Sequence, residues 1–202
     1  MSRRIHPIEV ESYGILRSRV DTRSLPRWTR AVTERVIHSS ADVSYSGDLV
    51  CDEDVLAAAA AALAAGAPLV VDAAMVGAGI TTYPSTCLVR DPDAAALAAA
   101  TGDTRSAAAF RLAAEQVGPG AVWVVGNAPT ALFALLDLDV APALVVGLPV
   151  GFVGSVESKE ALRASGLPAL TNRSEKGGSA VAAAAVNALL YGPNPLSEED
   201  HL

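Results

Sequence analysis

The amino-acid sequence predicts an α/β fold, with a mainly parallel sheet that has helices on both faces, a Rossmann-like three-layer arrangement, and a helical N-terminal segment. Two observations support this fold class. Helical stretches alternate with short runs of branched apolar residues, which is typical of parallel strands joined by crossover helices. Most of these runs lead into loops rich in glycine and small polar residues, as expected where ligands bind at the carboxyl ends of parallel strands.

The chain length bounds the number of domains. A chain of 202 residues suits one domain and is long enough to bury a sizeable apolar core. We expect residues 1–190 to form that domain. Residues 191–202 contain two prolines and several acidic residues, so we expect them to form a polar, loosely ordered tail.

The N-terminal part of the chain predicts two helices. Apolar residues recur at helical spacing over residues 8–20, which predicts the first helix. Ser24 is a suitable capping residue and Pro26 a suitable early-helix proline, so we expect the second helix to begin there and to end near His38. The polar stretch 42–48 predicts a turn.

An alternation of helices and strands follows. A helix over 54–65 is expected to stop at Gly66. Short branched apolar runs predict strands at 69–71, 86–89, 121–125, 144–146 and 168–170. The remaining stretches predict helices at 94–99, 104–117, 129–136, 155–164 and 178–190. Asp103 is expected to cap the helix that begins at Thr104.

Composition argues against nucleic acid and membrane partners. The formal net charge of −7 and a pI near 4.9 are unlike the basic balance of nucleic-acid binders. The mean hydropathy of +0.34 owes much to alanine, and the longest apolar run, 55–71, is broken by Gly66 and Pro68. A membrane span needs about 20 apolar residues. Because the first residues also contain no apolar signal core, we expect a soluble, cytoplasmic protein.

Common cofactor and catalytic motifs are broken or missing. Gly77 and Gly79 begin a dinucleotide-type pattern, but Thr82 occupies its third glycine position. The stretch 176–179 does not have the residue order of a P-loop, and no GxSxG elbow of a serine hydrolase occurs. Cys51 and Cys87 stand alone and are expected to be free thiols. Three scattered histidines do not predict a metal site.

Two side chains have both a functional and a structural interpretation. His38 is the histidine best placed for acid–base chemistry, but a cation at the carboxyl end of a helix is also stabilising without any function. Arg105 follows the start of a predicted helix, where a cation is mildly unfavourable and an anionic ligand would explain it. The alternative for Arg105 is a surface ion pair with a neighbouring acid.

Four loops at the predicted carboxyl ends of strands are candidates for ligand binding. They comprise residues 72–79, 126–130, 147–154 and 171–179, and their small residues allow backbone amides to approach a ligand closely. Several cations lie in or near candidate ligand-binding segments and together can hold carboxylates. These are Arg17, Arg19, Lys159, Arg173 and Lys176.

An ordered set of segments resembles the precorrin-8X methylmutases and their cobalt-precorrin-8 counterparts. The resemblance covers roughly residues 8–190, and its most specific part is the run 149–154, Pro-Val-Gly-Phe-Val-Gly, followed by Glu-Ser-Lys at 157–159. The other matching segments are 8–13, 36–38, 90–92, 103–108, 126–132, 147–148 and 176–179.

The resemblance implies an isomerase that moves a methyl group from C11 to C12 of the macrocycle. The product is hydrogenobyrinic acid, or a cobyrinic acid when cobalt is already bound. The shift is intramolecular, so no cofactor and no metal is expected. The resemblance also implies a homodimer with active sites near the subunit interface. His38 matches the active-site histidine of the family, and an imidazole can protonate a pyrrole-type nitrogen near neutral pH.

The implied substrate suggests roles for the loop residues. Its acetate and propionate arms need amides, hydroxyls and a few cations, and its flat body needs apolar walls such as Met75, Val76 and Val150. We expect Arg105, Arg17 and Lys159 to make the cleft positive. The candidate substrate-binding residues are Ser12, Arg17, Met75, Thr104, Arg105, Ser106, Asn127, Thr130, Pro149, Val150, Gly151, Lys159, Gly177, Gly178 and Ser179.

Two alternative functions come from other classes. A non-catalytic corrinoid or tetrapyrrole carrier with the same fold would keep the loops and use His38 only as a hydrogen-bond donor. A phosphosugar- or nucleotide-binding enzyme is disfavoured by the broken glycine motifs.

Overall fold

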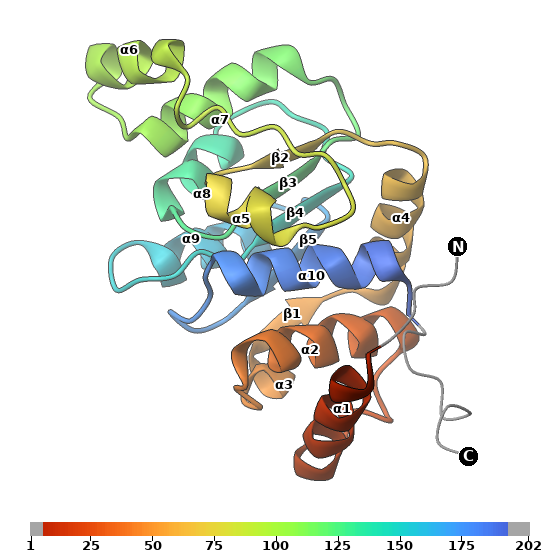
Figure 1. Cartoon of the computed structure of the whole chain (residues 1–202). Coiled ribbons are helices and arrows are strands. Elements are labelled where there is room, and N and C mark those ends of the chain that lie inside the picture. The colour runs from red at the N-terminus through yellow and green to blue at the C-terminus, as the bar shows by residue number, and fades with distance from the viewer. Residues whose placement is uncertain (1–5, 194–202) are drawn as a thin grey trace.

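The computed structural model describes residues 6–193 and contains a central sheet with strand order β1-β5-β4-β3-β2 (Figure 1). The pairs β2–β3, β3–β4 and β4–β5 are parallel, and β1 pairs antiparallel with β5. The strands are β1 (Leu49–Cys51), β2 (Leu69–Val71), β3 (Val122–Val125), β4 (Leu144–Gly147) and β5 (Ala169–Asn172).

Helices surround this sheet. They are α1 (Pro7–Arg19), α2 (Arg27–Ser40), α3 (Tyr45–Asp48), α4 (Glu53–Ala64), α5 (Ala74–Gly79), α6 (Pro92–Thr101), α7 (Arg105–Gln116), α8 (Pro129–Leu136), α9 (Ser155–Ala164) and α10 (Ser179–Tyr191). The predicted bounds of α8 and α9 are confirmed, and those of α1, α4, α7 and α10 differ by one residue at one or both ends.

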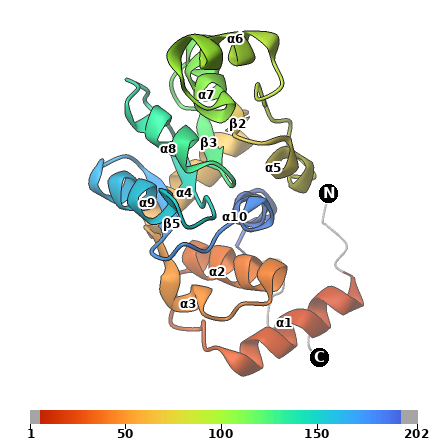
Figure 2. The same ribbon diagram turned by 90° about the vertical axis from the view of Figure 1, so that its left-hand side faces the viewer.

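Two apolar clusters, one on each face of the sheet, confirm the three-layer arrangement. Alternate residues of a strand face opposite sides, so Val124 joins the cluster that contains α2, α4, α5 and α10. Its neighbours Trp123 and Val125 join the cluster that contains α7, α8 and α9. The helix α1 packs on α2, which confirms the helical N-terminal segment (Figure 2).

The predicted strand 86–89 is wrong. Thr86 forms an isolated bridge with Val70, and its carbonyl accepts from the N–H of Val71 at 2.9 Å. The N–H of Asp91 then donates to the carbonyl of Leu88 at 2.9 Å, which closes a turn. The chain therefore leaves the sheet edge after one residue.

Three elements lie where no regular structure was predicted. The polar stretch 42–48 contains α3 and leads into β1, and the loop 72–79 contains α5. The position of β1 depends on its pairing with β5, since Val50 lies opposite Thr171. Because the paired residues are so far apart in the chain, the sequence near β1 contains little pattern from which this strand could be predicted.

The predicted helix caps also differ from the observed ones. Ser24 does not cap α2. The N-cap residue is Pro26, and the carboxylate of Glu53 accepts from the N–H groups of Trp28 and Thr29 at 2.8 and 2.9 Å. Asp103 does not cap α7, because the hydroxyl of Thr104 accepts from the N–H of Ala107 at 3.2 Å.

The expectations about membrane and tail concern different parts of the chain. Within residues 6–193, no helix is long and apolar enough to cross a membrane. Residue 191 of the predicted tail is the last residue of α10, and its hydroxyl lies 2.7 Å from that of Thr81. Residues 194–202 lie outside the described residues.

Candidate active site

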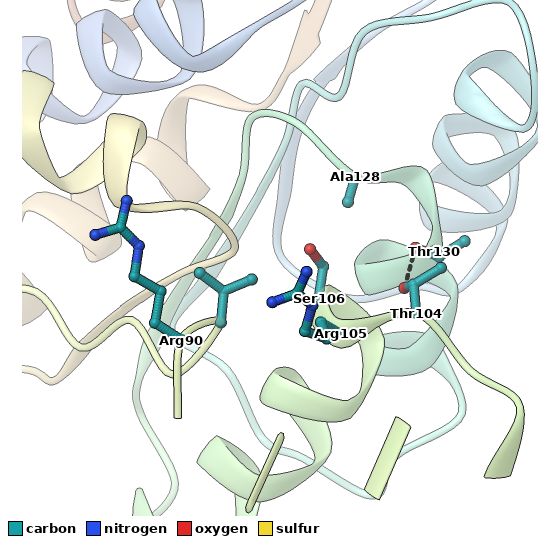
Figure 3. Close-up of a pocket in the computed structure, with 7 residues that line it drawn as sticks. Arg90, Thr104, Arg105, Ser106, Ala128 and Thr130 are labelled. Atoms are coloured by element: carbon teal, nitrogen blue, oxygen red, sulfur yellow. Dashed lines mark hydrogen bonds between the residues drawn. The ribbon is translucent and has the colours of Figure 1, made fainter. Parts of the chain in front are cut away.

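A pocket of about 400 Å³ opens where α7 and α8 begin. Thr104, Arg105 and Ser106 come from the start of α7, and Thr130 comes from the first turn of α8. The hydroxyls of Thr104 and Thr130 lie 2.7 Å apart and join the two helices (Figure 3). Val89, Arg90 and Ala128 complete the lining.

The pocket carries two guanidinium groups. Figure 3 shows Arg90 on one side of the pocket and Arg105 beside Ser106. In the part of the chain that the structure describes, neither arginine forms an ion pair, so the surface pair considered for Arg105 is not formed there. The amino end of α7 adds a partial positive charge. This combination suits a carboxylate ligand.

Sequence reasoning did not select Arg90 as a binding residue. The segment 90–92 was among those that resembled the family, but its position opposite Arg105 depends on the turn after Thr86. That turn was predicted as strand. The sequence therefore contained a signal for Arg90, but the wrongly predicted strand 86–89 hid its position opposite Arg105.

His38 lies near the carboxyl end of α2 in a second, smaller cavity of about 100 Å³. The hydroxyl oxygen of Ser12 is 2.8 Å from its Nδ1. The ring of Tyr13 stacks on the imidazole with centroids 5.0 Å apart and planes 20° apart. Two residues of α1 therefore fix the orientation of the ring.

The predicted site residues that line the two pockets lie apart within one chain. In both Figure 1 and Figure 2, α10 lies between α2 and the α7–α8 pair. His38 and Ser12 lie on one side of α10, and Arg105 and Thr130 lie on the other.

The glycine loops before α9 and α10 pack against each other. The N–H of Gly178 donates to the carbonyl of Leu148 at 2.9 Å. A Cβ atom at Gly177 would overlap the carbonyl oxygens of Leu148 and Pro149, so only glycine fits there. Gly151 and Ser179 are half-buried parts of the same two loops.

Some of the expected apolar walls are accessible and one is not. Met75 and Val150 are exposed at 63% and 45%, so both can contact a ligand. Val76 is fully buried in the core, and its prediction as a wall is wrong. Asn127 is exposed, whereas Pro149 is buried and its carbonyl accepts from the hydroxyl of Ser155 at 3.0 Å.

Two predicted cations of the cleft have other partners. Lys159 is fully buried, and its ammonium donates to the carbonyls of Ser174 and Lys176 at 2.7 and 2.6 Å. Burial lowers the pKa of Lys159 to about 8. The guanidinium of Arg17 pairs with the buried Glu34 through two bonds of 3.1 and 2.8 Å. Both cations therefore already have partners within the protein, and the arginines that line the pocket are Arg90 and Arg105.

The comparisons with known proteins agree on one family. The family model described as precorrin-8X methylmutase matches residues 7–192. The precorrin-8X methylmutase of Sinorhizobium sp is 43% identical over 190 residues, which cover 88% of this chain and 90% of that protein. The cobalt-precorrin-8 methylmutase of Salmonella typhimurium is 40% identical over 196 residues, covering 91% of this chain and 93% of that protein.

A similar solved structure carries the same description as these relatives. The structure described as precorrin-8X methyl mutase from Thermus thermophilus superimposes with a TM-score of 0.83 at 33% identity. It covers 92% of this chain, which in turn covers 96% of that one. These relatives are named as methylmutases, so the alternative of a non-catalytic carrier is not supported.

Proposed function

Because this chain belongs to the precorrin-8X methylmutase family, a family of isomerases of cobalamin biosynthesis, we propose that its substrate is precorrin-8X or cobalt-precorrin-8. The methyl group moves from C11 to C12 within one molecule. The bond to C11 breaks as the bond to C12 forms and the ring double bonds shift, so the atoms balance without a methyl donor, an oxidant or a reductant.

The observation that carries the proposal is the pocket with Arg90 and Arg105. Two guanidinium groups without an ion pair in the described residues, and two threonine hydroxyls at helix starts, match a substrate with many carboxylate arms. We assign the arms of the macrocycle to this pocket. Binding there would hold the ring with the migrating carbon aligned to its acceptor.

We assign proton donation to His38. Ser12 contacts Nδ1 and Tyr13 holds the plane of the ring, which favours Nε2 as the donating nitrogen. A proton on a pyrrole-type nitrogen of the substrate would favour the rearranged tautomer. In this mechanism Ser12 therefore orients the imidazole of His38.

We also propose a homodimer in which the active sites are shared. The separation of His38 from Arg105 by α10 supports an arrangement in which the two come from different subunits. Phe152 and Val153, in the loop 147–154, are exposed at 96% and 89%, and large exposed apolar side chains are typical of subunit contacts. We further propose that the enzyme is soluble and cytoplasmic, since a net charge of −7 favours neither nucleic acid nor an anionic membrane surface.

Incubation of the purified protein with precorrin-8X, followed by visible spectroscopy, tests the activity. Catalytic turnover to hydrogenobyrinic acid is expected. A spectral change that stops at one substrate per site would indicate a carrier and would contradict the proposal, as would no change at all. A parallel incubation with cobalt-precorrin-8 identifies the preferred substrate.

Mixing two inactive variants tests the shared site. His38→Ala and Arg105→Ala are each expected to be inactive alone under low-substrate conditions. After random exchange of subunits, half of the dimers contain one of each, and each such dimer has one intact site. Recovery of about a quarter of the wild-type activity is therefore expected. No recovery, with exchange verified by mass spectrometry, would place both residues in one subunit.

A further inference from the structure

Asp72 is a fully buried carboxylate that directly follows β2. One oxygen accepts from the N–H of Gly126 at 3.0 Å, and the other accepts from the N–H groups of Asn127 and Ala128 at 2.8 and 2.7 Å. Throughout residues 6–193, no side-chain cation bonds to it. Burial raises the pKa of this carboxyl group, and the N–H groups of the loop between β3 and α8 oppose that shift.

This loop has the position and the amides of an anion-binding loop. In α/β proteins, ligands bind at the carboxyl ends of parallel strands, where backbone N–H groups before a helix commonly hold phosphate. Here the carboxylate of Asp72 already occupies three such N–H groups. The protein therefore supplies its own anion, and the loop is closed to an external one.

The anchored loop leads directly to the arginine pocket. Ala128 and Thr130 line that pocket, and the hydroxyl of Thr130 meets Thr104 at 2.7 Å. The loop has little room to shift, because a Cβ atom at Gly126 would lie 2.8 Å from Val76 and 2.9 Å from Ala182. The loop therefore connects Asp72 with the wall of the pocket.

We propose that Asp72 is a positioning residue for the methyl shift: it fixes the turn 126–128 and thereby holds Thr130 against Thr104 on the wall of the substrate pocket. Asp72 does not touch the substrate and acts through the loop. Its effect on catalysis rests on the proposed function. Its effect on the loop does not, and the two are measured separately.

The first variant is Asp72→Asn, which keeps the shape of the side chain. One oxygen can still accept from Asn127 and Ala128, but the new amide group points a donor at the N–H of Gly126. We expect KM to rise about tenfold or more, with a smaller change in kcat, because pocket geometry is altered and the proton donor is not. The control is Asp137→Asn, the same charge change on a side chain that is 72% exposed at the end of α8. It should leave both constants unchanged.

Chemical rescue separates positioning from general damage. Asp72→Ala leaves a space beside three unpaired N–H groups, which a formate ion can fill. Formate should restore a substantial part of the lost KM, whereas chloride at equal ionic strength should not. Failure of formate to lower KM in the folded variant would overturn the proposal.

Amide hydrogen exchange decides the loop geometry without any substrate. Gly126, Asn127 and Ala128 should be protected in the wild type and should exchange at least about tenfold faster in Asp72→Asn. Equal rates would overturn the proposal even if the enzyme turns over precorrin-8X. Faster exchange in a protein without turnover would instead show that the loop assignment holds and the proposed function fails.

A second variant covers the case in which substitution at Asp72 prevents folding. Thr130→Val removes the exposed hydroxyl at the end of the proposed path and retains the shape of the side chain. It should raise KM by a similar factor while the thermal transition stays near that of the wild type. An unchanged KM for Thr130→Val would overturn the proposal.

Discussion

The hydroxyl oxygen of Ser12 lies 2.8 Å from Nδ1 of His38, although the two residues belong to different helices and are 26 positions apart. The next residue of α1, Tyr13, stacks on the same imidazole. The helix α1 packs against α2 and contributes no side chain to the two clusters on the sheet except Leu16. Its contribution to the site is therefore the orientation of His38.

Replacement of His38 by alanine should abolish turnover and leave binding of the macrocycle within about tenfold of the wild type. A neutral hydrogen bond contributes only ~0.5 to 1.5 kcal/mol net, so loss of the imidazole affects the proton transfer far more than the affinity. Turnover is followed by visible absorbance and affinity by fluorescence titration. A variant that turned over at the normal rate would show that His38 is not the proton donor.

Replacement of Arg105 by alanine should weaken binding of the macrocycle, and more strongly at low salt. The attraction between an exposed guanidinium and a carboxylate is screened as ionic strength rises. Titrations at low and high salt measure this dependence. Arg90→Ala should behave in the same way, and Arg27→Ala, an exposed cation outside the pocket, serves as the control. An unchanged affinity in Arg105→Ala would remove the arginine from the site.

Replacement of Lys159 by methionine should destabilise the loop before α10. The ammonium donates to the carbonyls of Ser174 and Lys176, and both acceptors lose a partner. The free energy of unfolding should fall by ~2 to 4 kcal/mol. Urea denaturation measures it, with Arg173→Met as the matched control. A loss below that of the control would show that the two bonds are not important for stability.

The pH dependence of stability should also depend on Lys159. Burial lowers the pKa of its ammonium to about 8, against an opposing effect of Asp48 and Glu175. Above that pH the folded chain has released a proton that the unfolded chain keeps, so stability rises with pH until the unfolded lysine titrates as well. The Tm of the wild type should therefore increase relative to Lys159→Met between about pH 8 and about pH 10. A constant difference would mean that Lys159 keeps its ordinary pKa.

Replacement of Gly177 by alanine should cost about 3 kcal/mol or more of stability. The added Cβ atom would overlap the carbonyl oxygens of Leu148 and Pro149, and the two loops would have to separate. Gly118→Ala is the control, because nothing lies within 4 Å of a Cβ atom there. Thermal denaturation of both variants provides the comparison. A similar Tm for the two would contradict the close packing of the loops.

Features that depend on residues close in the sequence were predicted well, and features that depend on distant residues were missed. The start of α8 was predicted correctly because Pro129 begins it, and the end of α4 was predicted to within one residue because Gly66 follows closely. The cap of α2 was missed because Glu53 comes from another helix. The same applies to β1, which is placed by β5.

The candidate site shows the same limit. Thr104, Arg105, Ser106 and Thr130 were selected from the sequence and lie in one pocket. Arg17 was assigned to the ligand because it lies near the candidate binding segments, and the structure pairs it with Glu34 from α2. Charges are visible in a sequence, but their partners depend on the tertiary structure.

The packing of α2 against α10 has a consequence for synthesis of the protein. His38 leaves the ribosome well before residues 179–191, yet the helix that carries it packs against those residues in the folded chain. Contacts between segments so distant in the chain form late in folding. A partly made chain therefore contains the proposed proton donor without its final surroundings, and the complete site forms only when α10 docks.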